Sequence, residues 1–244
     1  MWNVGYTGTD ATFAGIVNSA ATLNKYGEGK LSLTGSSSGN INVNEGTLSI
    51  ENATLTTSGT ISVKNGAMLC GTGATKNVVV ANGGSIAVGK TDNTLGTFNV
   101  NDKLTVQAGG QVVVKCRQSR CDAYKVTNAT VLNSPHFVMK LMNGNWLEDA
   151  ELKVFTGTGT ITLSGTPTFE PAIPMEGYEW DYSQLASDGI IGIKADATGI
   201  GDAARLNDKY KMINEKQMYD LQGRPVENPG RGVYIVNGKK TVIK

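Results

Sequence analysis

The sequence predicts an all-β protein: a right-handed single-stranded parallel β-helix, or solenoid, with a small β-hairpin or β-sandwich-like tail at its C-terminus. A strand–turn–strand pattern recurs four times between residues 41 and 115. Its turn glycines, Gly46, Gly66, Gly83 and Gly109, lie 20, 17 and 26 residues apart, a spacing typical of one coil per repeat. Gly is 31 of 244 residues while Pro is 6, which suits many tight corners and small stacked side chains.

Each copy of the pattern alternates apolar and polar residues on both sides of its turn. This alternation predicts that Ile61, Val63 and Met68 face the interior, and Cys70 then falls in the inward phase as well. The opposite face carries polar residues suited to water: Asn42, Asn44, Ser49, Ser62 and Lys64. The four copies are INVNEGTLSI (41–50), ISVKNGAMLC (61–70), VVVANGGSIAV (78–88) and LTVQAGGQVVV (104–114).

Residues 1–194 are predicted to form the β-helix, with capping strands from about residue 122. The alternating, glycine-punctuated segment 2–35 supplies the first one or two coils. The four repeats between residues 41 and 115, which we call the ladder, raise the total to five or six. Bulky side chains arrive where the regular repeats end, at Phe137, Trp146, Phe155, Phe169 and Trp180. We interpret them as a cover over the last coil, because an uncovered coil exposes an open strand edge; a sugar-stacking platform is the alternative.

A linker and a second β segment are predicted after the β-helix. Residues 195–215 are polar with little helical periodicity, and we interpret them as a linker. Residues 216–244 return to β patterning, with QMYDL, GVYIV and KKTVIK around turns at Gln222–Gly223 and Asn237–Gly238. Asn-Gly between alternating apolar runs is a strong hairpin signal.

Charge and hydropathy exclude several classes of partner. The formal net charge of +1 offers no general attraction for nucleic acid. No apolar run is long enough for a membrane-spanning helix, and we expect a monomer. The first ten residues lack the basic start and apolar stretch of a signal peptide. We therefore expect the chain to be the C-terminal part of a longer protein whose export signal lies upstream.

No catalytic or metal-binding constellation is evident, and we expect neither an enzyme nor a bound cofactor. The single histidine, His136, has no second histidine, cysteine or paired carboxylate near it in the sequence, and no nucleophile elbow accompanies it. The acids of the ladder, Glu45, Glu51, Asp92 and Asp102, are widely separated. Calcium would need several oxygen ligands from adjacent coils, so no metal site is predicted.

The three cysteines have different expected roles. Cys116 and Cys121 bracket RQSR where the ladder ends, and a local disulfide is favoured if the chain is exported, with two free thiols as the open alternative. Such a short loop would gain modest stability. Cys70 is expected to be a small buried residue.

The body of the chain resembles the autotransporter-associated β-strand repeat of secreted bacterial β-helices. The resemblance covers about four-fifths of the chain and is carried by TFAGIVNSAATLNKYGEGKLSLTGSS from Thr12, GTLSI, GAMLCGTG, LGTFNVNDKLTVQAGGQVVV from Leu95, and WDYSQLASDGIIGI from Trp180. The last segment resembles the closing element of the family, with motif residues Trp180, Asp181, Ser183, Leu185 and Gly189. The resemblance implies a passive scaffold or stalk attached to varied passengers, polysaccharide lyases among them.

The segment from Met218 to Lys244 resembles the C-terminal sorting tail of secreted Bacteroidetes proteins. It is shorter than the full domain of that family. The resemblance implies export by the type IX route to the cell surface or medium, with the sorting machinery as partner. The motif residues are Tyr219, Asp220, Gly223, Arg224, Gly232, Tyr234, Ile235, Gly238 and Lys239.

Three hypotheses for function follow. The first is a non-catalytic β-helix stalk of a secreted or surface-displayed protein, located outside the cell or on the outer-membrane surface. The second is a glycan-binding or adhesin module that grips polysaccharide or a host surface through rows of Asn and Thr, or through Trp2, Tyr6 and Tyr26. The third is the non-catalytic end of a pectate-type polysaccharide lyase.

Overall fold

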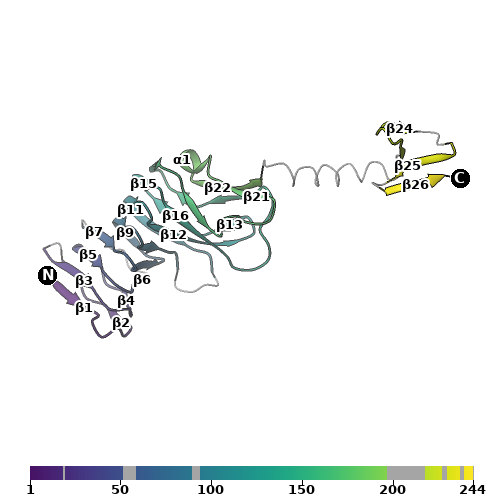
Figure 1. Cartoon of the computed structure of the whole chain (residues 1–244). Helices are drawn as coiled ribbons and strands as arrows, with labels where there is room; N and C mark the ends of the chain where they lie inside the picture. Colours follow the sequence, from purple (N-terminus) through teal and green to yellow (C-terminus); the bar gives the residue numbers. More distant parts are fainter. Residues whose placement is uncertain are drawn as a thin grey trace. The chain divides into compact units, whose positions relative to one another are not determined.

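The chain forms two compact units, Met1–Lys194 and Ala195–Lys244. The computed structural model describes residues 1–18, 20–51, 59–89, 94–196, 218–226, 230–236 and 239–243. The first unit is a parallel β-helix, as predicted, and its strands stack in chain order (Figure 1). The second unit holds an antiparallel sheet. Of the predicted linker, 195–215, only Ala195 and Asp196 lie within the described residues.

Two parallel sheets form the walls of the β-helix, and each coil adds one level to both. The first sheet contains β1 (Trp2–Val4), β3 (Thr22–Lys25), β5 (Asn40–Val43), β7 (Thr60–Val63), β9 (Ala74–Val80), β11 (Thr97–Val106), β14 (Ala123–Val126) and β18 (Phe155–Thr156), together with β15 (Ala129–Asn133) and β19 (Thr160–Ser164). The second contains β2 (Ala11–Phe13), β4 (Lys30–Leu33), β6 (Thr47–Ile50), β8 (Met68–Gly71), β10 (Ser85–Ile86), β12 (Gln111–Arg117), β16 (His136–Leu141) and β20 (Thr168–Glu170), with β13 (Arg120–Cys121) at one side.

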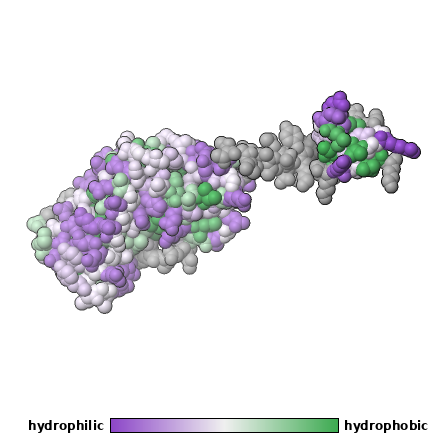
Figure 2. All heavy atoms as spheres, in the orientation of Figure 1, coloured by the Kyte–Doolittle hydropathy of each residue, from purple (hydrophilic) through white to green (hydrophobic). Residues whose placement is uncertain are grey.

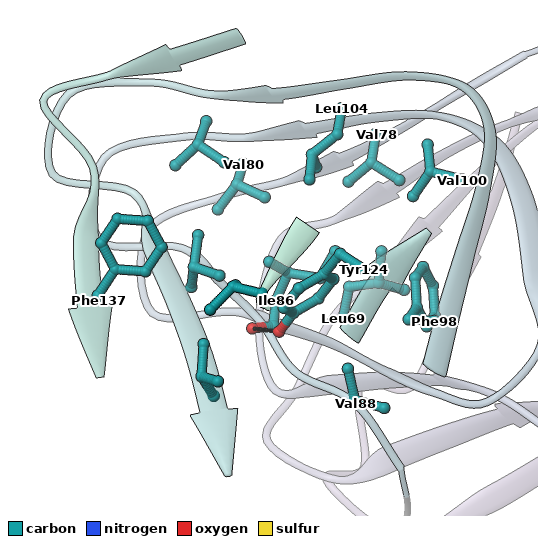
Figure 3. Packing of buried hydrophobic residues seen from close by; sticks show 14 of the residues in the cluster. Leu69, Val78, Val80, Ile86, Val88, Phe98, Val100, Leu104, Tyr124 and Phe137 are labelled. Atoms are coloured by element: carbon teal, nitrogen blue, oxygen red, sulfur yellow. Dashed lines mark hydrogen bonds between the residues drawn. The ribbon is translucent and has the colours of Figure 1, made fainter. Parts of the chain in front are cut away.

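The core is a set of apolar columns that run from coil to coil. In one column Ile41 pairs with Ile61, Ile61 with Val78 and Val78 with Leu104. These side chains are 0–1% exposed and point into the interior (Figure 3 shows Val78 and Leu104). Burying an aliphatic side chain of this size stabilises the folded state by roughly 1.5–3 kcal/mol, so repetition of the column supplies the main stabilisation of the rod.

The turns between the two sheets are joined by their own hydrogen bonds. The Gly66 N–H donates to the Gly83 carbonyl at 2.9 Å, and the Gly83 N–H donates to Gly109 at 3.0 Å. The series continues from Gly109 to Ser134 and from Ser134 to Ser164. Gly46, Gly66, Gly83 and Gly109 all have positive φ, a conformation that glycine adopts at little steric cost.

An inward-facing lysine interrupts one of the apolar columns. Lys25 pairs with Val4 on one side and Val43 on the other, and it is 1% exposed. Its Nζ donates to the backbone carbonyls of Tyr26, Gly27 and Glu45, which satisfies all three ammonium protons. Burial lowers the pKa of Lys25, an effect opposed by the charges of Glu45 and Asp10.

The predicted side-chain phase is wrong for β8. Leu48 lies two residues after its turn glycine, whereas Leu69, its partner in the stack, lies three residues after Gly66. The extra residue, Ala67, turns Met68 and Cys70 to the outer face. The prediction that Cys70 is buried is confirmed, because neighbouring coils leave it 8% exposed.

The β-helix extends further than the five or six coils predicted, because the stack continues past Asp122. Each parallel sheet passes through eight levels in the described residues. The cover that follows contains β17 (Glu151–Lys153), β21 (Tyr178–Asp181), the four-residue helix α1 (Leu185–Asp188) and β22 (Ile190–Ala195). The three strands form one small sheet in the order β17-β22-β21.

The second unit contains β23 (Met218–Tyr219), β24 (Pro225–Val226), β25 (Gly232–Val236) and β26 (Lys239–Ile243). These strands form a four-stranded sheet in the order β24-β23-β25-β26, with antiparallel neighbours throughout. The predicted hairpin between GVYIV and KKTVIK is therefore present, although its turn residues lie outside the described chain.

Alanine at two turn glycines should separate backbone strain from steric crowding. Both Gly46 (φ +60°) and Gly66 (φ +76°) adopt left-handed backbone conformations. A Cβ at Gly46 would lie 2.4 Å from the Gly27 carbonyl oxygen, whereas a Cβ at Gly66 meets no atom within 4 Å. Gly66→Ala should cost about 1 kcal/mol of unfolding free energy, and Gly46→Ala about 2 kcal/mol more, by urea denaturation. Equal losses would contradict the close stacking of these turns.

Candidate functional site

A crevice of about 220 Å³ opens on the outer face of the second sheet. It lies where the parallel pairing of β10 with β12 ends, after the pair Ile86–Val112. The next residues of the earlier coil stay with β8, because the Ala87 N–H donates to Leu69 and the Gly89 N–H to Gly71. Small and aliphatic side chains line the crevice, among them Met68, Cys70, Ala87 and Val113.

A buried ion pair forms one wall of the crevice. Lys115 Nζ lies 3.7 Å from Asp122 Oδ2, and the two side chains are 6% and 0% exposed. Asp122 also accepts hydrogen bonds from the N–H groups of Gly96 (2.9 Å) and Lys115 (3.2 Å), while Lys115 Nζ donates to the Thr94 carbonyl. Burial raises the pKa of Asp122, and these hydrogen bonds and the lysine charge oppose the rise. The pair ties three chain segments together.

Tyr124 bridges the break in the second sheet from inside. Its hydroxyl lies 2.9 Å from the Ile86 carbonyl and 2.7 Å from the Val113 carbonyl, on either side of the opening. Figure 3 shows Tyr124 beside Ile86 among the buried side chains. Complete burial raises the pKa of Tyr124 well above its ordinary value. Burial likewise raises the pKa of Cys70. Neither group is ionised near neutrality, so neither is an activated nucleophile.

The structure brings His136 next to two partners on the outer face of the second sheet. Its Nδ1 lies 2.8 Å from Thr168 Oγ1, and its Nε2 lies 3.6 Å from Glu170 Oε2. Sequence reasoning missed this neighbourhood because Thr168 and Glu170 are more than 30 residues away. The group lies on an open surface, with the Glu170 side chain 71% exposed. His136, Thr168 and Glu170 are not among the residues that line the crevice.

The described carboxylates of the ladder accept hydrogen bonds from other groups of the protein. Glu45 Oε2 accepts the Gly27 N–H, Glu51 Oε1 accepts the Ser49 hydroxyl, and Asp102 Oδ1 accepts the Asn128 amide. Asp92 lies outside the described residues. Within the described chain, no three His, Cys, Asp or Glu side chains converge as a metal site would require, and no helix there has the length and apolarity to cross a membrane.

Cys116 and Cys121 are directly opposite each other in the β12–β13 hairpin and are free thiols in the structure. The flanking pair is hydrogen-bonded, since the Asp122 N–H donates to the Lys115 carbonyl. A cysteine pair at the adjacent position has Cα atoms about 4.5 Å apart, within the range that a disulfide accepts. The disulfide itself stays a prediction.

The closing motif covers the end of the apolar core. Trp180 stacks on Phe169 at 5.6 Å, contacts Trp146 edge-on and donates Nε1–H to the Pro171 carbonyl. Leu185 is fully buried, and Asp181 accepts the Ser183 N–H. The Gly189 carbonyl accepts from Val154 and Phe155, and a Cβ at Gly189 would lie 2.4 Å from the Phe155 carbonyl oxygen. These contacts give the aromatic cluster a packing role.

The tail motif is built around Asp220. Its Oδ1 accepts the N–H groups of Gln222 and Arg224, and its Oδ2 accepts Arg224 Nε–H at 2.7 Å. These interactions, led by the Arg224 N–H, lower the pKa of Asp220. Gly223 turns the chain with φ +81°.

The remaining tail-motif residues lie in the strands. In the sheet, Tyr219 pairs with Ile235, Gly232 with Ile243 and Tyr234 with Thr241. Lys239 lies on β26, opposite Val236, and Gly238 falls outside the described chain.

No protein-family model matches the chain, and comparison with curated proteins finds no match.

Replacing Asp122 by alanine should lower the free energy of unfolding by about 3–5 kcal/mol, because it leaves the Lys115 ammonium and two N–H groups without this acceptor. Asp102→Ala removes an exposed hydrogen bond and should cost less than about 1 kcal/mol. Urea denaturation of both variants measures the difference. Comparable small losses would show that the buried pair does not hold the segments together.

The thiol pair should make the reduced protein sensitive to alkali. Burial raises the pKa of Cys121 from 9.0 to about 12, and that of Cys116 further. Above pH 9 the unfolded thiols ionise while the folded ones stay protonated, so stability falls by about 1.4 kcal/mol per pH unit for each thiol. Unfolding curves between about pH 8 and 10 test this. The oxidised protein and Cys116→Ala/Cys121→Ala should lose less stability; identical slopes in all three would refute the assignment.

Proposed function

We propose that this chain is a non-catalytic β-helix scaffold of a secreted or surface-displayed bacterial protein, exported through its C-terminal sorting tail. Its site of action is the cell exterior or the outer-membrane surface. The body acts as a stalk that holds a passenger away from the cell. The tail is recognised by the secretion machinery during export.

The continuous stack of the first unit carries the scaffold proposal. Apolar columns and turn hydrogen bonds link successive coils, so bending or separating two coils would break several contacts at once. The buried charged side chains of the body also stabilise the fold. Lys25 donates hydrogen bonds to turn carbonyls, and Asp122 and Lys115 form hydrogen bonds with neighbouring loop segments. A rod with this arrangement is suited to support and spacing.

The tail has the properties of a recognition element. Among its described side chains, none is fully buried, and Tyr219, Leu221 and Val242 are 36%, 59% and 63% exposed. Figure 2 shows hydrophobic side chains on the visible face of this unit. A four-stranded sheet with so little buried surface gains little stability by itself, and an exposed apolar surface of this kind favours a partner protein. The resemblance to sorting tails is the reason for proposing the export machinery as that partner.

Removing the tail should block export without unfolding the body. When both proteins carry an N-terminal export signal, a variant lacking residues 218–244 should keep the β-sheet circular dichroism and cooperative unfolding of the first unit, but unlike the full chain it should accumulate inside a bacterium that has the secretion route. Asp220→Ala should reduce the secreted fraction because it removes the acceptor that shapes the Gln222–Arg224 turn. Asp102→Ala, which changes an aspartate on the body, is the control. Undiminished secretion of the truncated protein would rule out the sorting role.

A further inference from the structure

The crevice on the second sheet extends into a shallow groove with lysines at both ends. Lys30 on β4 lies at one end and Lys140 on β16 at the other, and both are exposed. Lys115 and Asp122 lie between them as a pair that is neutral overall. The charged residues in the lining of the groove are three lysines and Asp122, and the Glu51 carboxylate, which accepts the Ser49 hydroxyl, lies near Cys70 on the same face.

The floor between the two lysines is aliphatic. Met68, Ala87 and Val113 come from three successive coils and point outward in a sheet whose outer face is otherwise rich in serine and threonine. Gly89 lies beside Lys115, where a Cβ would meet Nζ at 3.1 Å. Because Gly89 has no side chain, the floor beside Lys115 leaves room for the flat face of a ring that carries C–H groups. It contains no aromatic side chain.

The spacing of the lysines selects for an extended ligand. Lys30 and Lys140 are five levels apart in the second sheet, because β6, β8, β10 and β12 lie between their strands. At about 4.8 Å per level, this corresponds to about 24 Å along the stack. A chain of several linked rings with repeated negative charges can span this distance and contact both lysines.

We propose that this groove binds an extended carboxylate-bearing polysaccharide, with Lys30 and Lys140 pairing with carboxylates and the Met68–Ala87–Val113 floor contacting sugar rings. This binding activity is independent of the tail and goes beyond the scaffold role.

Other polyanions fit the groove less well. Single-stranded nucleic acid is held by stacking of its bases on aromatic side chains, which the floor lacks. An extended acidic peptide gains affinity by adding to a sheet edge, but β6 and β8 are each paired on both sides, and where β12 separates from β10 its Val113 carbonyl already lies 2.7 Å from the Tyr124 hydroxyl. A polysaccharide needs neither feature, because its rings bring their own apolar faces.

Binding of oligogalacturonate to the full chain at low ionic strength, measured by isothermal titration calorimetry, tests the proposal. The same oligosaccharide with its carboxylates methyl-esterified should not bind, and affinity should fall as salt screens the lysines. Lys30→Gln/Lys140→Gln should weaken binding about tenfold, and Lys30→Arg/Lys140→Arg should retain it. These side chains are exposed, so the variants should unfold at the same urea concentration as the parent protein.

The matched control places the same charge change on the other sheet. Lys103→Gln/Lys125→Gln removes two exposed lysines of β11 and β14 and should leave binding unchanged. The proposal is overturned by lack of binding, by equal loss in the two glutamine variants, or by equal affinity for polyglutamate or a DNA oligonucleotide. None of these outcomes bears on export through the tail, which the secretion assay tests separately.

Discussion

The in-register stacking of successive coils is the constraint on which the rest of this structure depends. Every coil must place an apolar residue over the one before it, as Ile41, Ile61, Val78 and Leu104 do, or the shared core is lost. The turns obey the same rule, since their N–H groups donate to the carbonyls of the next turn. Tight stacking also explains the small residues at the corners, because a Cβ at Gly46 would collide with the coil beneath.

Departures from regular stacking generate the chemically distinctive features of the molecule. Where β10 stops pairing with β12, the single Tyr124 hydroxyl lies within hydrogen-bond distance of two backbone carbonyls, those of Ile86 and Val113. The gap leaves room for the crevice, and the long connection that follows is tied down by the Lys115–Asp122 pair. The same opening is therefore accompanied by buried polar groups and provides a groove flanked by exposed lysines. Stability and potential binding share a single cause here.

The two units differ in how they are stabilised. The body buries aliphatic columns and finishes them with the Trp180 cluster, so its core is closed at that end. The tail has no fully buried side chain among its described residues and relies on strand pairing and the Asp220–Arg224 turn. A marginal sheet with exposed apolar side chains is suited to recognition, because a partner supplies the missing burial. This contrast supports the proposal that the first unit is a scaffold and the second a recognition element.

Local signals in the sequence determined the architecture. Glycine spacing, strand alternation and the aromatic closing segment predict a β-helix, its cover and a hairpin tail, because each depends on neighbouring residues. The phase of Met68 and Cys70, the number of coils and the partners of His136 followed from the tertiary structure alone. These depend on which residues of different coils are stacked together. One extra turn residue, Ala67, is enough to move Met68 and Cys70 from the inner face of the sheet to the outer face. The groove also depends on the tertiary structure, because its two exposed lysines are 110 positions apart in the sequence. It forms where the pairing of β10 with β12 ends, and no local sequence pattern predicts that break.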